Sequence, residues 1–314
     1  MTDIIFLTSE KGSVETLEYE ASLMLEGGGM RCAFTVGVLD FFLDQKIEFP
    51  AVATASAGAL IGSSYIARQR DRNTNLLAAI TKSRGTISIR RLLQKKELFS
   101  MDLIFDKLSN QAFPLEFQAF SQSESKFIIG TTDINTGKPE FYDQFNRQMD
   151  LSTVIRASCS LPVLAPSIDY KGKQLIDGGV ADPIPITPLI EQGFKRHVIV
   201  LTRNKDYVKQ PTKLNWFYKH MFKDKPNLIK LLRDRHLRYN ETMEKIRTME
   251  ARNEVFVIQP EKPLEASRIE KSQQKLEALY YQGYQVAQEK HQALLDFLQS
   301  AQNQPMLAEG NMTS

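Results

Sequence analysis

A serine set among very small residues, between two apolar segments, constrains the fold of this chain more than any other feature. The apolar run Ala51-Val52-Ala53 precedes the turn Thr54-Ala55-Ser56-Ala57-Gly58, and a helix-compatible apolar run follows at 59–67. This order predicts a strand, a sharp turn and a buried helix. In such a turn the serine hydroxyl points out of the backbone and can act as a nucleophile, and Gly58 leaves room for the strand and the helix to approach each other.

Ser56 has a second interpretation that this stretch alone leaves open. The usual G-x-S-x-G pattern has a glycine two residues before the serine, and Thr54 occupies that position here. A serine at the start of a helix is also a common N-cap, whose side chain accepts a hydrogen bond from the first helical turn. The stretch therefore predicts either a nucleophile or a helix cap at Ser56.

Three consecutive glycines form another strand-to-helix turn upstream of the serine. A predicted strand at 21–26 leads into Gly27-Gly28-Gly29, and the apolar spacing at 33–43 favours a helix. Backbone N–H groups at the positive end of a helix can bind an anion, either a cofactor phosphate or the oxyanion formed when a serine attacks an ester. The glycines could also serve only as a tight turn. Parallel pairing of the two strands would place this turn beside the serine turn at one edge of the sheet.

An aspartate ends a predicted strand further along the chain. Gln174-Leu175-Ile176 leads to Asp177, and Gly178-Gly179 follows on a corner that we expect to be exposed and flexible. Asp177 is therefore either a turn residue or a carboxylate that serves Ser56 directly as a general base. We expect structural or solvent-facing roles for the histidines, which are His197, His220, His236 and His291.

Composition and motifs exclude several classes of function. The net charge of +3 is too small to indicate a nucleic-acid partner. Cys32 and Cys159 have no metal-binding spacing, the dinucleotide fingerprint G-x-G-x-x-G fails at Cys32, and no P-loop lysine follows the glycines, so we expect neither a metal nor a nucleotide cofactor. The N-terminus lacks the basic start and apolar core of a secretory signal, and no apolar run approaches the ~20 residues of a membrane span. We therefore expect a cytoplasmic protein.

Three turns in this order resemble the patatin-like phospholipase family. The turns are, along the chain, 27–32, 54–58 and 177–179. The resemblance extends over about 23–185 and includes the segments 133–139 and 157–162. The sequence Leu-Glu-Gly-Gly-Gly-Met-Arg, followed by Gly-Val-Leu-Asp, is particularly similar to a bacterial branch of the family.

The resemblance implies an α/β fold, a three-layer sandwich in which helices flank a mostly parallel sheet, with a helical C-terminal extension. Ser56 would be the nucleophile and Asp177 the general base of a serine-aspartate dyad, which would cleave acyl esters of phospholipids or related lipids through an acyl-enzyme intermediate. The oxyanion hole would be formed by the backbone amides of Gly28, Gly29 and Ala57. Residues that would support the turns are Gly27, Arg31, Gly58, Gly178 and Gly179.

Two departures from the family pattern motivate an alternative. Cys32 replaces the last glycine of the first motif, and Thr54 replaces the first glycine of the serine motif. The branched threonine could narrow the acyl pocket or shift the serine. The alternative is a catalytically weak or inactive member of the family that binds lipid or a protein partner.

Composition divides the chain into four predicted regions. These are an N-terminal extension at 1–20, the patatin-like catalytic domain at 21–202, a basic and mainly helical region at 203–300, and a polar tail at 301–314 that we expect to be disordered.

The basic region carries a predicted membrane-contacting segment. Residues 203–238 contain eleven Lys or Arg against three Asp, and Phe217 and Phe222 lie on one apolar helical face next to Lys213. Such a face can rest on anionic lipid at the inner membrane surface, or it can pack on the protein's own core.

Overall fold

The computed structural model describes residues 20–300, except 84, 87, 89, 92–96 and 214. The predicted tail at 301–314, and all but the last residue of the predicted extension at 1–20, lie outside this part of the chain. Among the described helices, none combines the length and the apolar character that a membrane span requires.

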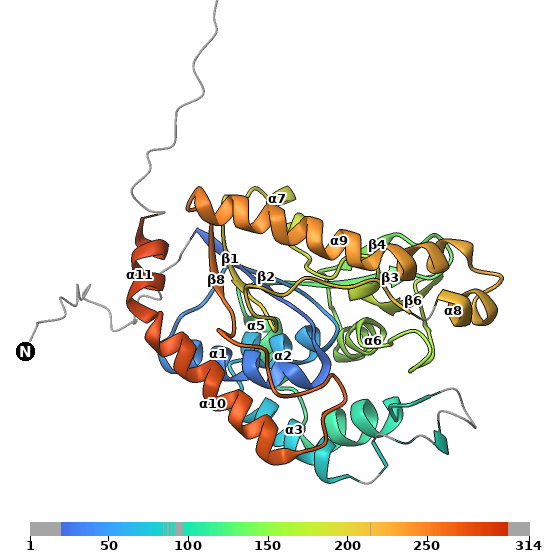
Figure 1. Cartoon of the computed structure of the whole chain (residues 1–314). Helices are drawn as coiled ribbons and strands as arrows, with labels where there is room; N and C mark the ends of the chain where they lie inside the picture. The colour runs from blue at the N-terminus through green and yellow to red at the C-terminus, as the bar shows by residue number, and fades with distance from the viewer. Residues whose placement is uncertain are drawn as a thin grey trace, which may run out of the picture.

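One sheet of eight strands forms the centre of the described structure (Figure 1). The strands are β1 (Ala21–Leu25), β2 (Ala51–Ala55), β3 (Lys126–Asp133), β4 (Pro139–Tyr142), β5 (Ile168–Tyr170), β6 (Lys173–Asp177), β7 (Arg196–Val200) and β8 (Val255–Ile258). Their order is β5-β6-β3-β2-β1-β7-β8, and β4 also pairs with β3. Strands β3, β2, β1, β7 and β8 are parallel, whereas β4, β5 and β6 pair in antiparallel fashion. The predicted mostly parallel sheet is confirmed.

Helices cover both faces of the sheet, as Figure 1 shows. The longer helices are α1 (Ala33–Asp44), α2 (Ala57–Ile66), α3 (Arg72–Lys82), the π-helix η2 (Asp102–Ala112), α5 (Phe117–Gln122), α6 (Gln148–Ser158), α7 (Thr187–Glu191), α8 (Asn215–Met221), α9 (Pro226–Ala251), α10 (Gln273–Glu289) and α11 (His291–Gln299). Two short 3-10 helices are η1 (Gly29–Cys32) and η3 (Gly178–Val180). Helices α7 and α9 lie on one face, and α1, α2, α6 and α10 lie on the other.

Side chains of the central strands alternate between the two faces. Leu23 and Leu25 of β1 belong to the core that α1 and α10 cover, whereas Met24 belongs to the core that Tyr239 of α9 helps to form. Because both faces are buried, these strands are almost continuous hydrophobic runs. The three-layer sandwich is therefore present.

The C-terminal ends of β2 and β6 meet on the same edge of β3. Residues 129–130 of β3 pair with both β2 and β4, and residues 131–132 pair with both β4 and β6. Because β4 occupies one edge throughout, β2 and β6 share the opposite edge. Their last residues, Ala55 and Asp177, pair with consecutive residues of β3. The residue that follows β2, which is Ser56, is thereby brought to the carboxylate at the end of β6.

The C-terminal region is part of the same fold. Strand β8, which lies in the region predicted at 203–300, continues the sheet beside β7. Helix α10 packs on α1, and the two backbones meet at glycines: an ideal Cβ on Gly37 would lie 2.0 Å from the carbonyl O of Tyr280, and one on Gly283 would lie 1.9 Å from that of Phe34. Only glycine allows so close an approach.

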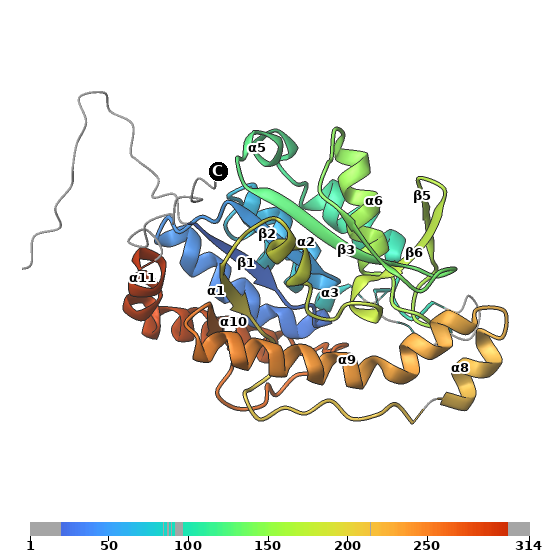
Figure 2. The same ribbon diagram turned by 90° about the horizontal axis from the view of Figure 1, so that it is seen from above.

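The segment predicted to contact a membrane runs from β7 alongside α9 to α8 (Figure 2). Phe222 packs partly against a small buried cluster that includes Leu228 of α9, so packing on the core accounts for part of the predicted apolar face. The Phe217 side chain lies outside the described part of the chain. Lys213 is exposed, and Trp216 is 72% exposed.

Candidate active site

Ser56 occupies a sharp turn between β2 and α2. Its backbone has φ 59° and ψ −138°, a strained conformation for a residue other than glycine. Its side chain makes no capping hydrogen bond to α2, so the helix-cap interpretation is wrong. Its backbone N–H donates to Ser158 Oγ at 2.8 Å, and that hydroxyl donates to the carbonyl O of Gly130 at 2.6 Å. Ser158, a residue that the sequence analysis did not single out, ties the strained turn to β3.

Two glycines allow the glycine turn and the serine turn to lie side by side. An ideal Cβ on Gly27 would lie 2.7 Å from Ser56 Cβ, and one on Gly58 would lie 2.2 Å from Thr54 Oγ1. Both distances are below the 3.0 Å that real Cβ atoms keep from other atoms. Parallel pairing of β1 with β2 brings the turns together as predicted.

The Thr54 side chain lies next to Gly58 and does not line the cavity into which Ser56 opens. It is fully buried, and its Oγ1 has no hydrogen-bond partner among the described residues. Its hydroxyl fills the space next to Gly58, and the residues of this stretch that line the adjoining cavity are Ala55 and Ser56. The threonine is therefore placed to fix the spacing between β2 and α2.

Asp177 is buried, with 1% of its surface exposed, and not on the exposed corner that we expected. Gly178 explains the difference, because an ideal Cβ there would lie 2.1 Å from the carbonyl O of Gly130, so only glycine lets this strand end pack against β3. Asp177 Oδ1 accepts a hydrogen bond from Gly179 N at 2.8 Å. Asp177 Oδ2 is buried and has no hydrogen-bond partner among the described residues.

Burial raises the pKa of Asp177 above its ordinary value of 3.8. The Ser56 side chain, the positive charges of Arg235 and Arg268, and the Gly179 amide all act in the opposite direction and favour the ionised form. A carboxylate with a raised pKa is a stronger base than an exposed one, and Oδ2 has no competing donor.

The glycine turn is held by a segment from the C-terminal region. Gly29 has φ +60°, and an ideal Cβ on it would lie 2.5 Å from the carbonyl O of Arg268. Met30 N donates to the same oxygen at 3.1 Å. The glycine turn thus contacts Ser56 through Gly27 and the segment that carries Arg268 through Gly29, and Gly28 and Gly29 both line the same cavity.

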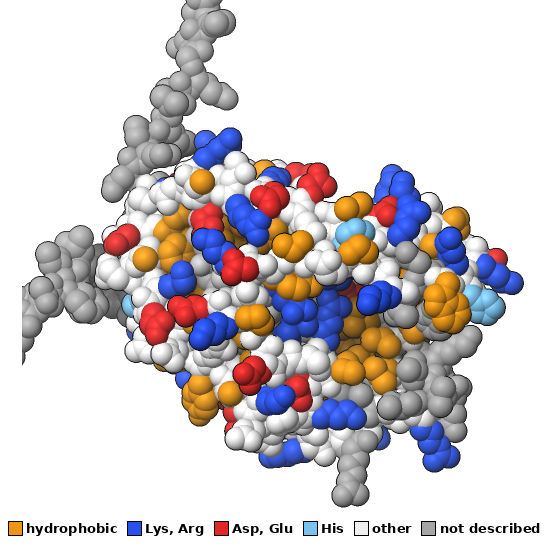
Figure 3. Space-filling model, viewed as in Figure 1, with side chains coloured by type: hydrophobic (Ala, Val, Ile, Leu, Met, Phe, Trp, Pro, Cys, Tyr) orange, Lys and Arg blue, Asp and Glu red, His pale blue; other side chains and the backbone are white. Residues whose placement is uncertain are grey.

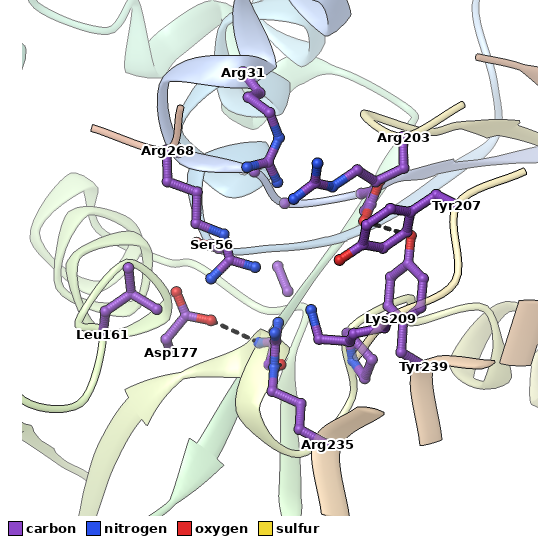
Figure 4. A pocket seen from close by; sticks show the side chains of 17 residues that line it. Arg31, Ser56, Leu161, Asp177, Arg203, Tyr207, Lys209, Arg235, Tyr239 and Arg268 are labelled. Carbon is purple, nitrogen blue, oxygen red and sulfur yellow. Dashed lines mark hydrogen bonds between the residues drawn. The ribbon is translucent and has the colours of Figure 1, made fainter. Parts of the chain in front are cut away.

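Arg31 follows the glycine turn and points into this cavity (Figure 4). Only 3% of its surface is exposed, and its Nε has no hydrogen-bond partner in the described part of the chain. Burial, together with the positive charges of Arg203 and Arg268, lowers the pKa of Arg31 to about 10. The guanidinium is therefore a buried cation with an unused donor.

A small cavity, partly open to solvent, joins these groups. One wall comes from the turns after β1, β2 and β6. The other wall consists of residues that the sequence analysis missed: Arg203, Tyr207, Lys209, Arg235, Tyr239 and Arg268. The excess of basic residues at 203–238 is the signal that points to Arg203, Lys209 and Arg235, but the sequence analysis considered only a membrane surface or the protein's own core as the partner of that segment.

Glu26 ties this second wall to the sheet. Its Oε2 accepts hydrogen bonds from Thr202 N at 2.7 Å and from Thr202 Oγ1 at 2.9 Å, and its Oε1 accepts one from the Tyr239 hydroxyl at 3.2 Å. A buried carboxylate with three donors thus connects β1, the end of β7 and α9.

The cysteines and the buried histidine are not among the described residues that line the cavity. Burial raises the pKa of Cys32 to about 12 and also raises that of Cys159, so both thiols stay protonated near neutral pH. His197 Nδ1 lies 2.7 Å from Ser22 Oγ within the core, as expected for a structural histidine. No group of His, Cys, Asp or Glu among the described residues could hold a metal ion.

Two family models match parts of this chain. Residues 23–190 match the model described as Patatin-like phospholipase. Residues 225–299 match a model described as a domain of unknown function. The first covers the turns that carry Ser56 and Asp177, and the second covers α9, the segment with Arg268, and α10.

Several known proteins are similar to this chain. The uncharacterized protein YjjU of Escherichia coli is 26% identical over 254 residues, which cover 77% of this chain and 69% of that one. An uncharacterized NTE family protein of Mycobacterium tuberculosis is 27% identical over 54% of this chain and 45% of its own length. A lysophospholipase NTE1 of Cryptococcus neoformans is 26% identical over 58% of this chain and 11% of its own length. The structure of VipD from Legionella pneumophila aligns with a TM-score of 0.44 and 14% identity over 90% of this chain and 67% of that one. The chain thus spans less than half of the mycobacterial and fungal relatives.

Proposed function

Because the chain belongs to the patatin-like phospholipase family, we propose that it hydrolyses acyl esters of lipids with Ser56 as nucleophile and Asp177 as general base. The observation that carries this proposal is that the C-terminal ends of β2 and β6 meet on β3, which brings the strained turn of Ser56 close to the buried carboxylate of Asp177. No histidine lies among the described residues that line the cavity, so the carboxylate acts on the serine directly.

In the proposed reaction, Ser56 Oγ attacks the carbonyl carbon of the ester while Asp177 Oδ2 takes the hydroxyl proton. The carbonyl oxygen becomes an oxyanion, which the backbone amides of Gly28, Gly29 and Ala57 would stabilise. Collapse of the intermediate breaks the ester bond, and the proton on Asp177 passes to the departing alkoxide. Water then attacks the acyl-serine with Asp177 again as base, and the proton returns to Ser56 as the fatty acid leaves.

Single substitutions at the dyad test this proposal. Ser56→Ala and Asp177→Asn should each lower kcat/KM for a short p-nitrophenyl ester by roughly a thousandfold or more, because removal of one member of a catalytic unit abolishes most of the rate enhancement that the whole unit provides. Ser121→Ala and Asp206→Asn, which change the same residue types at exposed positions, should keep wild-type activity. Wild-type activity in either dyad variant with an unchanged melting temperature would refute the dyad.

The alternative of a weak or inactive lipid-binding protein depended on obstruction by Thr54. The buried position of that side chain, under the turn and against Gly58, argues against obstruction. We therefore expect Thr54→Gly to gain no esterase activity. A large gain in the glycine variant would support the alternative.

A cytoplasmic location with peripheral contact to an anionic membrane surface is also part of the proposal. Exposed Trp216 and Lys213 support such a contact, whereas Phe222 is only partly exposed and packs in part on the protein's own core. A phospholipid or a related acyl ester is the proposed substrate, and no nucleic-acid partner is proposed.

A further inference from the structure

Five cationic side chains converge on the cavity that contains Ser56. They are Arg31, Arg203, Lys209, Arg235 and Arg268. Figure 4 shows them approaching the cavity from several sides and from separate parts of the chain. On the face shown in Figure 3, Lys and Arg side chains gather near the centre, beside a patch of hydrophobic side chains. The lining of the cavity therefore carries an excess of positive charge.

None of these five cations forms an ion pair within the part of the chain that the structure describes. Arg203 stacks on the Tyr207 ring at 4.3 Å, and Lys209 lies over the Tyr239 ring at 5.1 Å. Two carboxylates line the cavity: Glu26 accepts hydrogen bonds from Thr202 and Tyr239, and Asp177 is the proposed base. The two carboxylates therefore offset only part of the positive charge of the five cations.

Holding these cations together is unfavourable for the protein alone. Burial and the charges of Arg235 and Arg268 lower the pKa of Lys209 to about 7. Burial and the charge of Arg268 likewise lower the pKa of Arg235 to about 10. Arrangements that cost stability without an internal partner are typical of sites that bind a ligand of opposite charge.

We infer that this cavity binds the phosphate group of a phosphorylated acyl ester, an inference that rests on the proposed hydrolase function. Phosphate oxygens accept several charge-assisted hydrogen bonds at once, and guanidinium groups match their geometry. A neutral ester would leave the five cations desolvated and unpaired, and a zwitterionic headgroup would add another cation to them. The cavity therefore selects against both.

The backbones that carry two of these cations are already fixed. Lys209 exchanges two backbone hydrogen bonds with the side chain of Asn240 in α9, at 2.9 Å and 3.1 Å. The carbonyl O of Arg268 accepts from Met30 N at the glycine turn. Both backbones are thus held in place before a ligand arrives, which lowers the entropic cost of binding. The inference gives the region from 203 to 268 a role in recognising the substrate headgroup.

The first experiment compares esters that share one acyl chain. The full chain is assayed on lysophosphatidic acid, lysophosphatidylcholine and monoacylglycerol in the same nonionic micelles. We expect kcat/KM for the phosphomonoester to exceed that for the neutral ester by about tenfold or more. Lys209→Gln and Arg268→Gln should each lower this ratio, whereas Lys230→Gln and Arg252→Gln, at exposed positions, should leave it unchanged.

The second experiment measures binding without turnover. Ser56→Ala protein is titrated with lysophosphatidic acid and with monoacylglycerol below their critical micelle concentrations. We expect the phosphorylated lipid to bind about tenfold more tightly or better, and inorganic phosphate to displace it at fixed ionic strength. Lys209→Gln should reduce this difference in affinity between the two lipids, and Lys230→Gln should leave it unchanged.

The outcomes separate the two proposals. Turnover of all three esters at equal rates would overturn the phosphate inference and leave the hydrolase proposal intact. No turnover together with a retained binding preference would refute the hydrolase and support the phosphate site. If inorganic phosphate binds but the two lipids bind equally, the site serves free phosphate, and the inferred substrate class is wrong.

Discussion

Docking of the C-terminal region on the core depends on the contact between α1 and α10, and Gly283→Ala tests it. An ideal Cβ on Gly283 would lie 1.9 Å from the carbonyl O of Phe34 and 2.7 Å from its carbonyl carbon. Both atoms belong to the backbone of α1, so neither can rotate away. Helix α10 would have to move by at least 1.1 Å to restore the 3.0 Å that real Cβ atoms keep.

The size of the effect follows from two opposing contributions. Replacing glycine by alanine inside a helix would by itself stabilise the protein by about 1 kcal/mol. Overpacking typically costs about 1–3 kcal/mol, and more where rigid atoms collide. We expect a net loss of about 2 kcal/mol, which corresponds to a Tm about 3 °C lower for a chain of this size.

The assay is thermal unfolding of the full chain, followed by circular dichroism. Gln288→Ala, an exposed substitution on the same helix, is the control and should change stability by no more than about 0.5 kcal/mol. Because the segment that carries Arg268 leads into α10, Gly283→Ala should also lower the preference for the phosphorylated ester. A Gly283→Ala protein that melts at or above the wild-type temperature would refute the close backbone contact.

Five further predictions follow from the structure. Ser158→Ala leaves the Ser56 N–H without a partner and should cost about 1–3 kcal/mol in urea unfolding, with lower esterase activity; an unchanged midpoint would contradict this role. Esterase kcat/KM should fall as the pH drops through a pKa above 3.8, because protonated Asp177 cannot act as base. Because the folded protein binds the Asp177 proton more tightly than the unfolded chain, loss of this proton above the folded pKa lowers the free energy of unfolding. Asp177→Asn should therefore be at least as stable as the wild type at pH 8, and the difference in stability between the two proteins should shrink towards acid pH. Inhibition by sulfate, whose own charge does not change over this pH range, should weaken above about pH 7 because Lys209 loses its charge. Inhibition that does not change with pH would count against Lys209 as a group that binds the anion. Trp216→Ser should weaken salt-sensitive binding to anionic vesicles, and unaltered binding would place the contact elsewhere.

Local patterns predicted the parts of the site that depend on local backbone chemistry. Glycine and small residues near Ser56 indicated close contact between strand and helix, and the structure places Gly27 and Gly58 where a Cβ would collide. Parallel pairing of β1 and β2 followed from the short crossover through α1. These features involve neighbouring segments, whose geometry is determined by a few residues.

Features that depend on distant pairing could not be predicted in the same way. Burial of Asp177 results from the antiparallel return of β6 onto β3, and a single strand pattern does not show which edge that strand will join. The cationic wall combines residues 203–209 with Arg235 and Arg268, which are far apart in the sequence. Within the predicted mainly helical region at 203–300, α10 begins only at Gln273, because Ser272 caps it, and α11 is a separate helix that begins after Lys290.

The most direct test of the account is to identify the serine that reacts with a fluorophosphonate probe. Wild-type protein is labelled, digested and mapped by mass spectrometry, without any assumption about the substrate. The account predicts a single labelled site at Ser56, and strongly reduced labelling in Asp177→Asn at neutral pH. Labelling at another serine, or none at Ser56 in a protein that remains folded, would contradict the assignment of Ser56 as the nucleophile.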